Sequence, residues 1–140
     1  MIAWIVLVLV NILLFFNTNE DKRLREVKMR YKKLRDHLKS KGIFPMIHEE
    51  IPITAHYGMS KAIGYNANKG AEIGLCIDGT VNDIFHVLLH ELAHCTVEEY
   101  SHSKHFWANF DKIKGEAISI GIYENITSRT PFCGKHIMDK

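Results

Sequence analysis

Residues 84–94 read IFHVLLHELAH, and this stretch decides the fold that we expect. Its apolar residues surround most of a helix, which is typical of a helix buried in a domain. Thr80 precedes the stretch as an N-cap, and Asp83 three residues later has the place of a capping-box partner. The pattern predicts a capped, deeply buried helix.

This helix carries the motif His90-Glu91-Leu92-Ala93-His94. Residues four apart lie one turn above each other, so His90 and His94 can bind one tetrahedral zinc ion at about 2.0–2.1 Å. Zinc lowers the pKa of a bound water to about 7, and Glu91 is expected to act as the general base towards that water. His86 lies one further turn upstream and is interpreted as a neighbour of the site, because three histidines along one straight helix spread too far for one zinc ion.

A catalytic zinc site needs a third protein ligand and an open position for water. Glu98 and Glu99 follow His94 too closely to belong to a second helix. We prefer His102, which is expected at the entry of the next helix after a turn long enough to reverse the chain, and His105 is the alternative ligand. The candidates for stabilising the tetrahedral oxyanion, among which the sequence does not choose, are Tyr100, Tyr123 and His105.

The chain upstream of the motif helix predicts a helix and then a hairpin. Between Asp21 and Lys41 apolar residues recur at steps of three and four, with Gly42 as the stop. This stripe is expected to pack on the domain's own sheet, although a coiled coil between neighbouring chains would show the same pattern. The later segments that we predict are an extended segment or edge strand over 43–55, hairpin strands over 62–65 and 72–77, a helix over 104–114, and then only short elements and a loose tail.

The N-terminus is predicted to be an uncleaved transmembrane anchor over residues 1–19. Residues 2–16 read IAWIVLVLVNILLFF, and neither a basic region before this run nor a cleavage site after it suggests a signal peptide. Residues 20–42 form a basic juxtamembrane helix, so the positive-inside rule puts the catalytic domain on the cytoplasmic side of a single-pass protein. The basic residues also suit lipid head groups or nucleic acid, and the Asn125-Ile126-Thr127 sequon is interpreted as a chance match.

Length and cysteine usage limit the alternatives. A chain of 140 residues has room for one compact domain, which we place at 43–140. Its three cysteines are widely spaced and resemble no secreted disulfide framework, so a reducing compartment is expected. Cys133 and His136 have a metal-binding spacing, but they lack the second pair that a structural zinc site needs.

Residues 63–113 resemble the WLM metalloproteases, relatives of the SprT and Spartan proteins. The likeness rests on the hairpin Ile63 to Leu75, on the helix Leu88 to His94, and on His102-Ser-Lys-His-Phe106-Trp107, in which a Phe follows the third His by four positions. The resemblance implies an α+β, minigluzincin-like zincin fold with a short sheet and an active-site helix, peptide-bond hydrolysis, and His102 as the third ligand. The linker from His94 to His102 is about two residues longer than that family pattern, and an N-terminal anchor is not typical of it.

The sequence therefore predicts a membrane-anchored zinc metallopeptidase acting on proteins or peptides, with Zn²⁺ on His90, His94 and His102. The substrate is expected to lie along the edge of the sheet. Two alternatives differ in class: a catalytically silent zinc-containing membrane adaptor, and a DNA-stimulated protease acting on DNA–protein crosslinks. The intact Glu91 argues against the adaptor, because a pure binding module needs no general base.

Overall fold

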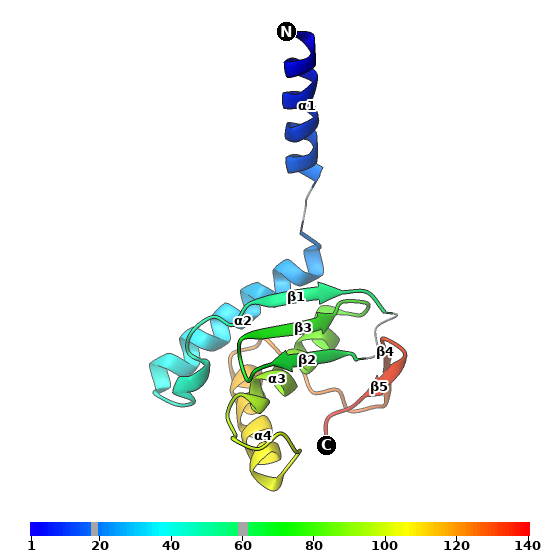
Figure 1. Cartoon of the computed structure of the whole chain (residues 1–140). Helices are drawn as coiled ribbons and strands as arrows, with labels where there is room; N and C mark the ends of the chain where they lie inside the picture. Colours follow the sequence, from blue (N-terminus) through cyan, green and yellow to red (C-terminus); the bar gives the residue numbers. More distant parts are fainter. Residues whose placement is uncertain (18–19, 59–61) are drawn as a thin grey trace.

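The computed structural model describes residues 1–17, 20–58 and 62–140. Helix α3 (Val81–His94) is the central element, since it contacts strands β2 (Gly64–Ala67) and β3 (Glu72–Cys76) and also helices α2 (Lys22–Lys41) and α4 (Lys104–Ser119) (Figure 1). Its residues from Ile84 to Leu89 are all buried. The predicted α+β class with a buried motif helix is confirmed.

The main sheet has three strands in the order β1-β3-β2, with β1 at Ile53–His56. β2 and β3 form the predicted antiparallel hairpin, and its turn uses positive φ at Asn68, Lys69 and Gly70. β1 is an edge strand, as predicted, and it pairs with β3 in parallel. β2 is the other edge, and it is the edge that contacts α3.

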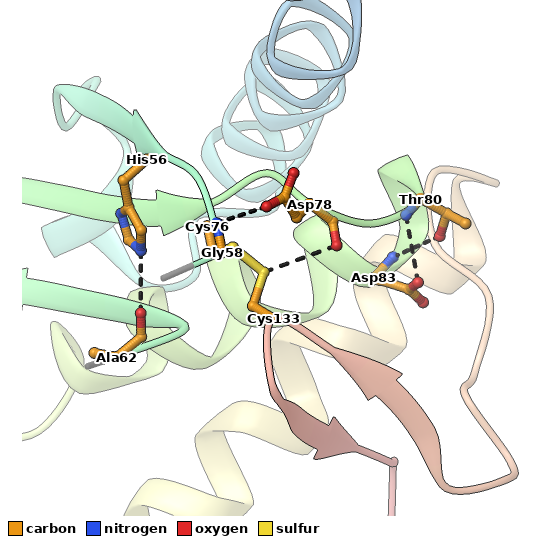
Figure 2. Close-up of a disulfide and its surroundings, with 8 residues drawn as sticks. All are labelled: His56, Gly58, Ala62, Cys76, Asp78, Thr80, Asp83 and Cys133. Carbon is orange, nitrogen blue, oxygen red and sulfur yellow. Dashed lines mark hydrogen bonds between the residues drawn. A yellow bond between two sulfur atoms is a disulfide. The ribbon is translucent and has the colours of Figure 1, made fainter. Parts of the chain in front are cut away.

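The predicted capping box at the start of α3 is present. The Asp83 amide donates to the Thr80 hydroxyl at 3.2 Å, and the Thr80 amide donates to the Asp83 carboxylate at 3.4 Å (Figure 2). These bonds satisfy amide groups that a helix start leaves without partners. The register of α3, and with it the positions of the motif side chains, is therefore fixed from its first residue.

Helix α2 buries the apolar stripe that the sequence predicts. It ends at Gly42, whose φ of 64° makes a left-handed C-cap. The stripe is buried within the same chain. It was expected to pack on the sheet, but α2 packs instead mainly against α3 and α4. The buried residues of the stripe are Leu24, Val27, Tyr31, Leu34 and Leu38.

The basic residues of this helix are largely paired with carboxylates. Seven of the ten Lys and Arg side chains between positions 22 and 41 lie within 4.0 Å of an acidic oxygen. Three of these pairs reach later segments of the chain, namely Arg35 with Glu50, Lys39 with Glu49 and Lys41 with Glu116. Because most of its positive charge is matched by nearby negative charge, the helix surface is less cationic than the sequence alone indicates.

The N-terminal helix α1 (Ile2–Asn17) is shorter than the predicted anchor. At about 1.5 Å per residue, its 16 residues rise about 24 Å against a hydrocarbon core of about 30 Å. Thr18 and Asn19, which the predicted span included, lie outside the described residues. No helix in the described part of the chain has both the length and the apolar character needed to cross a membrane, so the predicted transmembrane helix is not supported.

The C-terminal third is more ordered than the sequence suggests. α4 continues through Gly115 to Ser119, because the burial of Ile113 and Ala117 outweighs the roughly 1 kcal/mol by which Gly disfavours a helix relative to Ala. β4 (Thr130–Phe132) and β5 (Lys135–Ile137) then form a second hairpin. The expected short elements are therefore present, but the expectation of a loose tail is wrong.

A disulfide joins this second hairpin to the main sheet. Cys76 at the end of β3 is bonded to Cys133, with a Cα–Cα distance of 6.6 Å (Figure 2). The prediction that the cysteines are reduced is wrong for these two, and Cys133 is not free to bind a metal with His136. Sequence spacing failed here because the bond closes over 57 residues. Cys95 carries a free thiol.

Candidate metal centre

Helix α3 presents the ionisable residues of its motif on one side of the domain. The ring centroids of His90 and His94 lie 5.0 Å apart, as expected for side chains one turn apart. Both histidines are partly exposed, whereas Glu91 is only 7% exposed. The helix thus provides two accessible imidazoles and one almost buried carboxyl group.

A third imidazole reaches the same place because the chain reverses between α3 and α4. The ammonium of Lys69, from the hairpin turn, donates a hydrogen bond to the His94 carbonyl oxygen at 3.4 Å. It also donates to the carbonyl oxygens of Val97 and Glu99, the latter at 2.7 Å. One cation therefore holds the connecting loop against the main hairpin, and Ser103 then caps α4 directly after His102.

The three imidazoles converge on one point. The Nε2 atom of His102 lies 3.0 Å from that of His90 and 3.2 Å from that of His94. Two zinc–nitrogen bonds of about 2.0–2.1 Å at a tetrahedral angle give a nitrogen–nitrogen distance of about 3.3 Å. The donor set therefore fits a tetrahedral ion with one position left for a non-protein ligand. Within residues 1–17, 20–58 and 62–140, these three histidines are the group of donors close enough to share a metal ion.

Aromatic rings from α4 form the floor under the histidines. Phe106 is fully buried, and its ring centroid lies 5.0, 4.5 and 4.8 Å from those of His90, His94 and His102. Trp107 lies 5.6 Å from His102, measured between centroids. The rings restrict the rotamers of all three imidazoles and exclude water from one side of the cluster.

Burial sets the protonation of these groups. Desolvation, together with the neighbouring His94 and His102, lowers the pKa of His90 to about 3, and desolvation also lowers the pKa of His94. Neutral imidazole is the form that binds a metal. Desolvation raises the pKa of Glu91 to about 7, in the range suited to a general base at neutral pH.

The main hairpin approaches Glu91 closely. A Cβ atom on Gly64 would lie 2.4 Å from Val87 Cγ1 and 3.1 Å from Glu91 Oε1, so only glycine permits this contact. Further along β2, the Asn66 side-chain amide donates to the Glu91 carbonyl oxygen at 2.8 Å. The edge strand is thus fixed beside the carboxyl group, a role of Gly64 and Asn66 that the hairpin pattern alone did not reveal.

The other residues proposed from the sequence lie outside the cluster. His105 is exposed, and its Nε2 lies 3.4 Å from the Asn109 amide nitrogen. Tyr100 is 80% exposed, with the Lys69 ammonium 4.6 Å from its ring centroid. Tyr123 is 2% exposed, and its hydroxyl oxygen lies 2.9 Å from His86 Nδ1. Glu98 is exposed, and Glu99 accepts a hydrogen bond from the Ser103 hydroxyl.

Cavities flank the cluster on three sides. One of about 180 Å³ lies between the main hairpin and α3, and its lining includes Gly64, His86, His90 and Glu91. A second of about 190 Å³ is lined by Asn66, Lys69, Glu91, His94 and Tyr100. A third of about 100 Å³ lies between α3 and α4. Glu91 borders both of the larger cavities.

Three converging imidazoles, a buried carboxyl group and an adjacent sheet edge in a small α+β domain define a metallopeptidase. The WLM domain model matches residues 50–135, which cover more than half of the chain and include the sheet, α3, α4 and all three histidines. The chain therefore belongs to the WLM family, as its sequence motifs predicted.

The fold is similar to that of Wss1, and a second solved structure matches more weakly. The crystal structure of Wss1 from Saccharomyces cerevisiae is similar over 70% of this chain and 76% of that chain, with a TM-score of 0.55 and 21% identity. A crystal structure of the zymogen of the metallopeptidase abylysin from Pyrococcus abyssi matches over 69% of this chain and 96% of that chain, with a TM-score of 0.43 and 19% identity. No curated protein matches the sequence significantly.

Proposed function

We propose that this chain is a zinc-dependent endopeptidase. The observation that supports it most is the convergence of the Nε2 atoms of His90, His94 and His102 beside Glu91. These three histidines would hold the ion, and Glu91, which is only 7% exposed, is not one of the donors that converge there. A bound zinc ion would polarise the scissile carbonyl and lower the pKa of a water ligand to about 7.

The protein's own groups carry the proton. Glu91, whose pKa burial raises to about 7, accepts a proton from the attacking water and delivers it to the leaving nitrogen. The floor of Phe106 and Trp107 keeps the imidazoles in place. Because the carboxyl group is almost buried, its proton passes to the substrate in preference to bulk solvent.

An extended peptide is the substrate that the surface suits. β2 is an edge strand, and Gly64 at its start lies against Glu91. A peptide added to this edge would pair through its backbone, which gives affinity with little sequence preference. It would enter the cavity of about 180 Å³ that contains Gly64 and Glu91.

Removal of the metal tests the proposal. The full chain in detergent micelles, loaded with zinc, is expected to cleave denatured casein into fragments that are resolved by mass spectrometry. Dialysis against a chelator is expected to abolish cleavage, and added zinc to restore it. Cleavage that continues in protein shown to be free of metal would contradict the zinc-dependent mechanism.

Membrane attachment through α1 is part of the proposal. Its large apolar side chains are 44% exposed or more, which suits an apolar surrounding better than water. Two features point to opposite sides of the membrane. The basic helix that follows α1 favours a catalytic domain on the cytoplasmic side. The Cys76–Cys133 disulfide favours an oxidising compartment and so argues against that orientation.

The DNA-stimulated alternative receives less support. Seven of the ten basic side chains between positions 22 and 41 lie beside carboxylates, so their charge is partly matched before any nucleic acid arrives. The silent-adaptor alternative is opposed by Glu91, whose burial destabilises the folded chain and has no use in a pure binding module.

A further inference from the structure

His86 is a nearly buried histidine with no role in the proposed mechanism. It lies one turn before His90 on α3 and is 8% exposed. Its Nδ1 atom lies 2.9 Å from the Tyr123 hydroxyl oxygen and 3.1 Å from Asp139 Oδ1. One side of the ring is thus held by two groups from the C-terminal segment.

The hydrogen bonds around Asp139 fix the proton on this ring. The Tyr123 hydroxyl and the Ile126 amide, at 2.8 Å, both donate to Asp139 Oδ2. Burial raises the pKa of Asp139, but the hydrogen bonds from His86 and Tyr123 outweigh it and lower the pKa, so the group is a carboxylate. Since the Tyr123 hydroxyl already donates its proton to Asp139, its oxygen can only accept from His86 Nδ1, and Asp139 Oδ1 lies close to the same nitrogen. Nδ1 therefore carries a hydrogen, and Nε2 is the ring nitrogen left for another partner.

The C-terminal segment that holds His86 is itself firmly anchored. The Asp139 amide donates to the Ile126 carbonyl oxygen at 2.9 Å. Lys114 of α4 lies 3.4 Å from Asp139 Oδ1. The disulfide of Cys133 attaches the hairpin β4–β5 to β3 (Figure 2). The orientation of the His86 ring therefore depends on a C-terminal segment that is attached to both α4 and β3.

The free side of the ring faces the active site. His86 lines the cavity of about 180 Å³ together with Gly64 and Glu91, and also the cavity of about 100 Å³ together with Trp107. His90 borders both cavities. No hydrogen bond from the described residues reaches His86 Nε2. Because Nδ1 contacts Tyr123 and Asp139, Nε2 is the ring nitrogen that is left for a ligand in the cavities.

We propose that His86 is a further substrate-binding residue, whose Nε2 accepts a hydrogen bond from one backbone N–H of the peptide bound between β2 and the histidine cluster. The inference rests on the proposed peptidase function. In this proposal the imidazole has its hydrogen on Nδ1 and presents Nε2 as an acceptor, which suits an amide N–H better than an oxyanion. Tyr123, which the sequence suggested as an oxyanion stabiliser, acts in this proposal through His86.

A scan of N-methylated peptides tests this contact. The probe is a synthetic peptide that spans the main site at which the zinc-loaded full chain cleaves casein, and each backbone N–H is methylated in turn. At one position, methylation is expected to lower kcat/KM of the wild type about tenfold, the effect of one hydrogen bond. The same methylation is expected to cause no additional loss in His86→Phe or in His86→Leu, which serves if the first variant fails to fold.

The comparison separates contact from structure. A merely structural role would lower kcat/KM of the His86 variants equally for all peptides, and equal methylation penalties in wild type and variant at every position would overturn the proposal. His136→Phe, at an exposed site on β5, is the matched control and is expected to keep the wild-type profile. If the wild type with zinc cleaves no peptide and no casein, the proposed function itself fails, which is a different result.

Discussion

Replacement of Glu91 by Gln is expected to lower the rate of casein cleavage by about 10²–10⁴-fold while leaving metal binding intact. The amide has nearly the shape of the carboxyl group but accepts no proton. Because the three imidazoles come from His90, His94 and His102, the substitution removes no ligand. Cleavage is followed by mass spectrometry, and metal content is measured on the same preparations.

The same substitution is expected to stabilise the metal-free protein at high pH. Burial raises the pKa of Glu91 from 4.5 to about 7, so the folded state resists ionisation by about 3 kcal/mol at 1.36 kcal/mol per unit. The wild type bears this destabilisation fully above about pH 7 and loses it as the pH falls towards 4.5. Metal-free Glu91→Gln is therefore expected to be the more stable protein at pH 8, and the difference to disappear below pH 4.5, as measured by urea unfolding.

Two outcomes would contradict the role of Glu91. Cleavage at the wild-type rate in Glu91→Gln would show that another group moves the proton. Loss of the metal would show that the carboxylate takes part in binding the ion, contrary to its position beside the cluster. Glu98→Gln, which changes an exposed carboxyl group on the following loop, is the matched control and is expected to behave as wild type.

Replacement of His102 by Ala is expected to weaken zinc affinity by more than about 100-fold, whereas His105→Ala is expected to leave it unchanged. Loss of a group outside the metal's own ligands typically lowers affinity by about 10–100-fold, and His102 contributes a ligand nitrogen itself. His105 is exposed, with a 3.4 Å contact to Asn109. Titration with zinc against a competing chelator measures both variants, and loss of affinity in His105→Ala alone would move the third ligand to that residue.

The parts of the fold that local sequence specifies were predicted correctly. Thr80 and Asp83 mark the start of α3 because a capping box needs only four consecutive residues. The turn of the main hairpin was visible because Asn and Gly tolerate positive φ. His102 was found by its distance from the motif and by a family pattern that ends at Phe106, and the structure brings its ring to those of His90 and His94.

The features that the sequence did not predict depend on contacts between distant residues. The Cys76–Cys133 bond and the 3.1 Å contact of His86 Nδ1 with Asp139 join segments that are far apart in the sequence, and no local pattern predicts which distant residues meet. The role of Lys69 was hidden because a lysine at a hairpin tip ordinarily faces water, and here it binds the loop that leads to His102. The C-terminal segment has no strong secondary-structure signal in its sequence, and it is anchored by the buried side chain of Asp139.

Anomalous diffraction at the zinc edge, from crystals of the full chain grown with zinc, tests the central claim most directly. One peak is expected, at about 2.0–2.1 Å from each of the Nε2 atoms of His90, His94 and His102. A peak bonded to His105 or Glu91 in place of any of these three, or no peak at this site in protein that retains its fold, would contradict it.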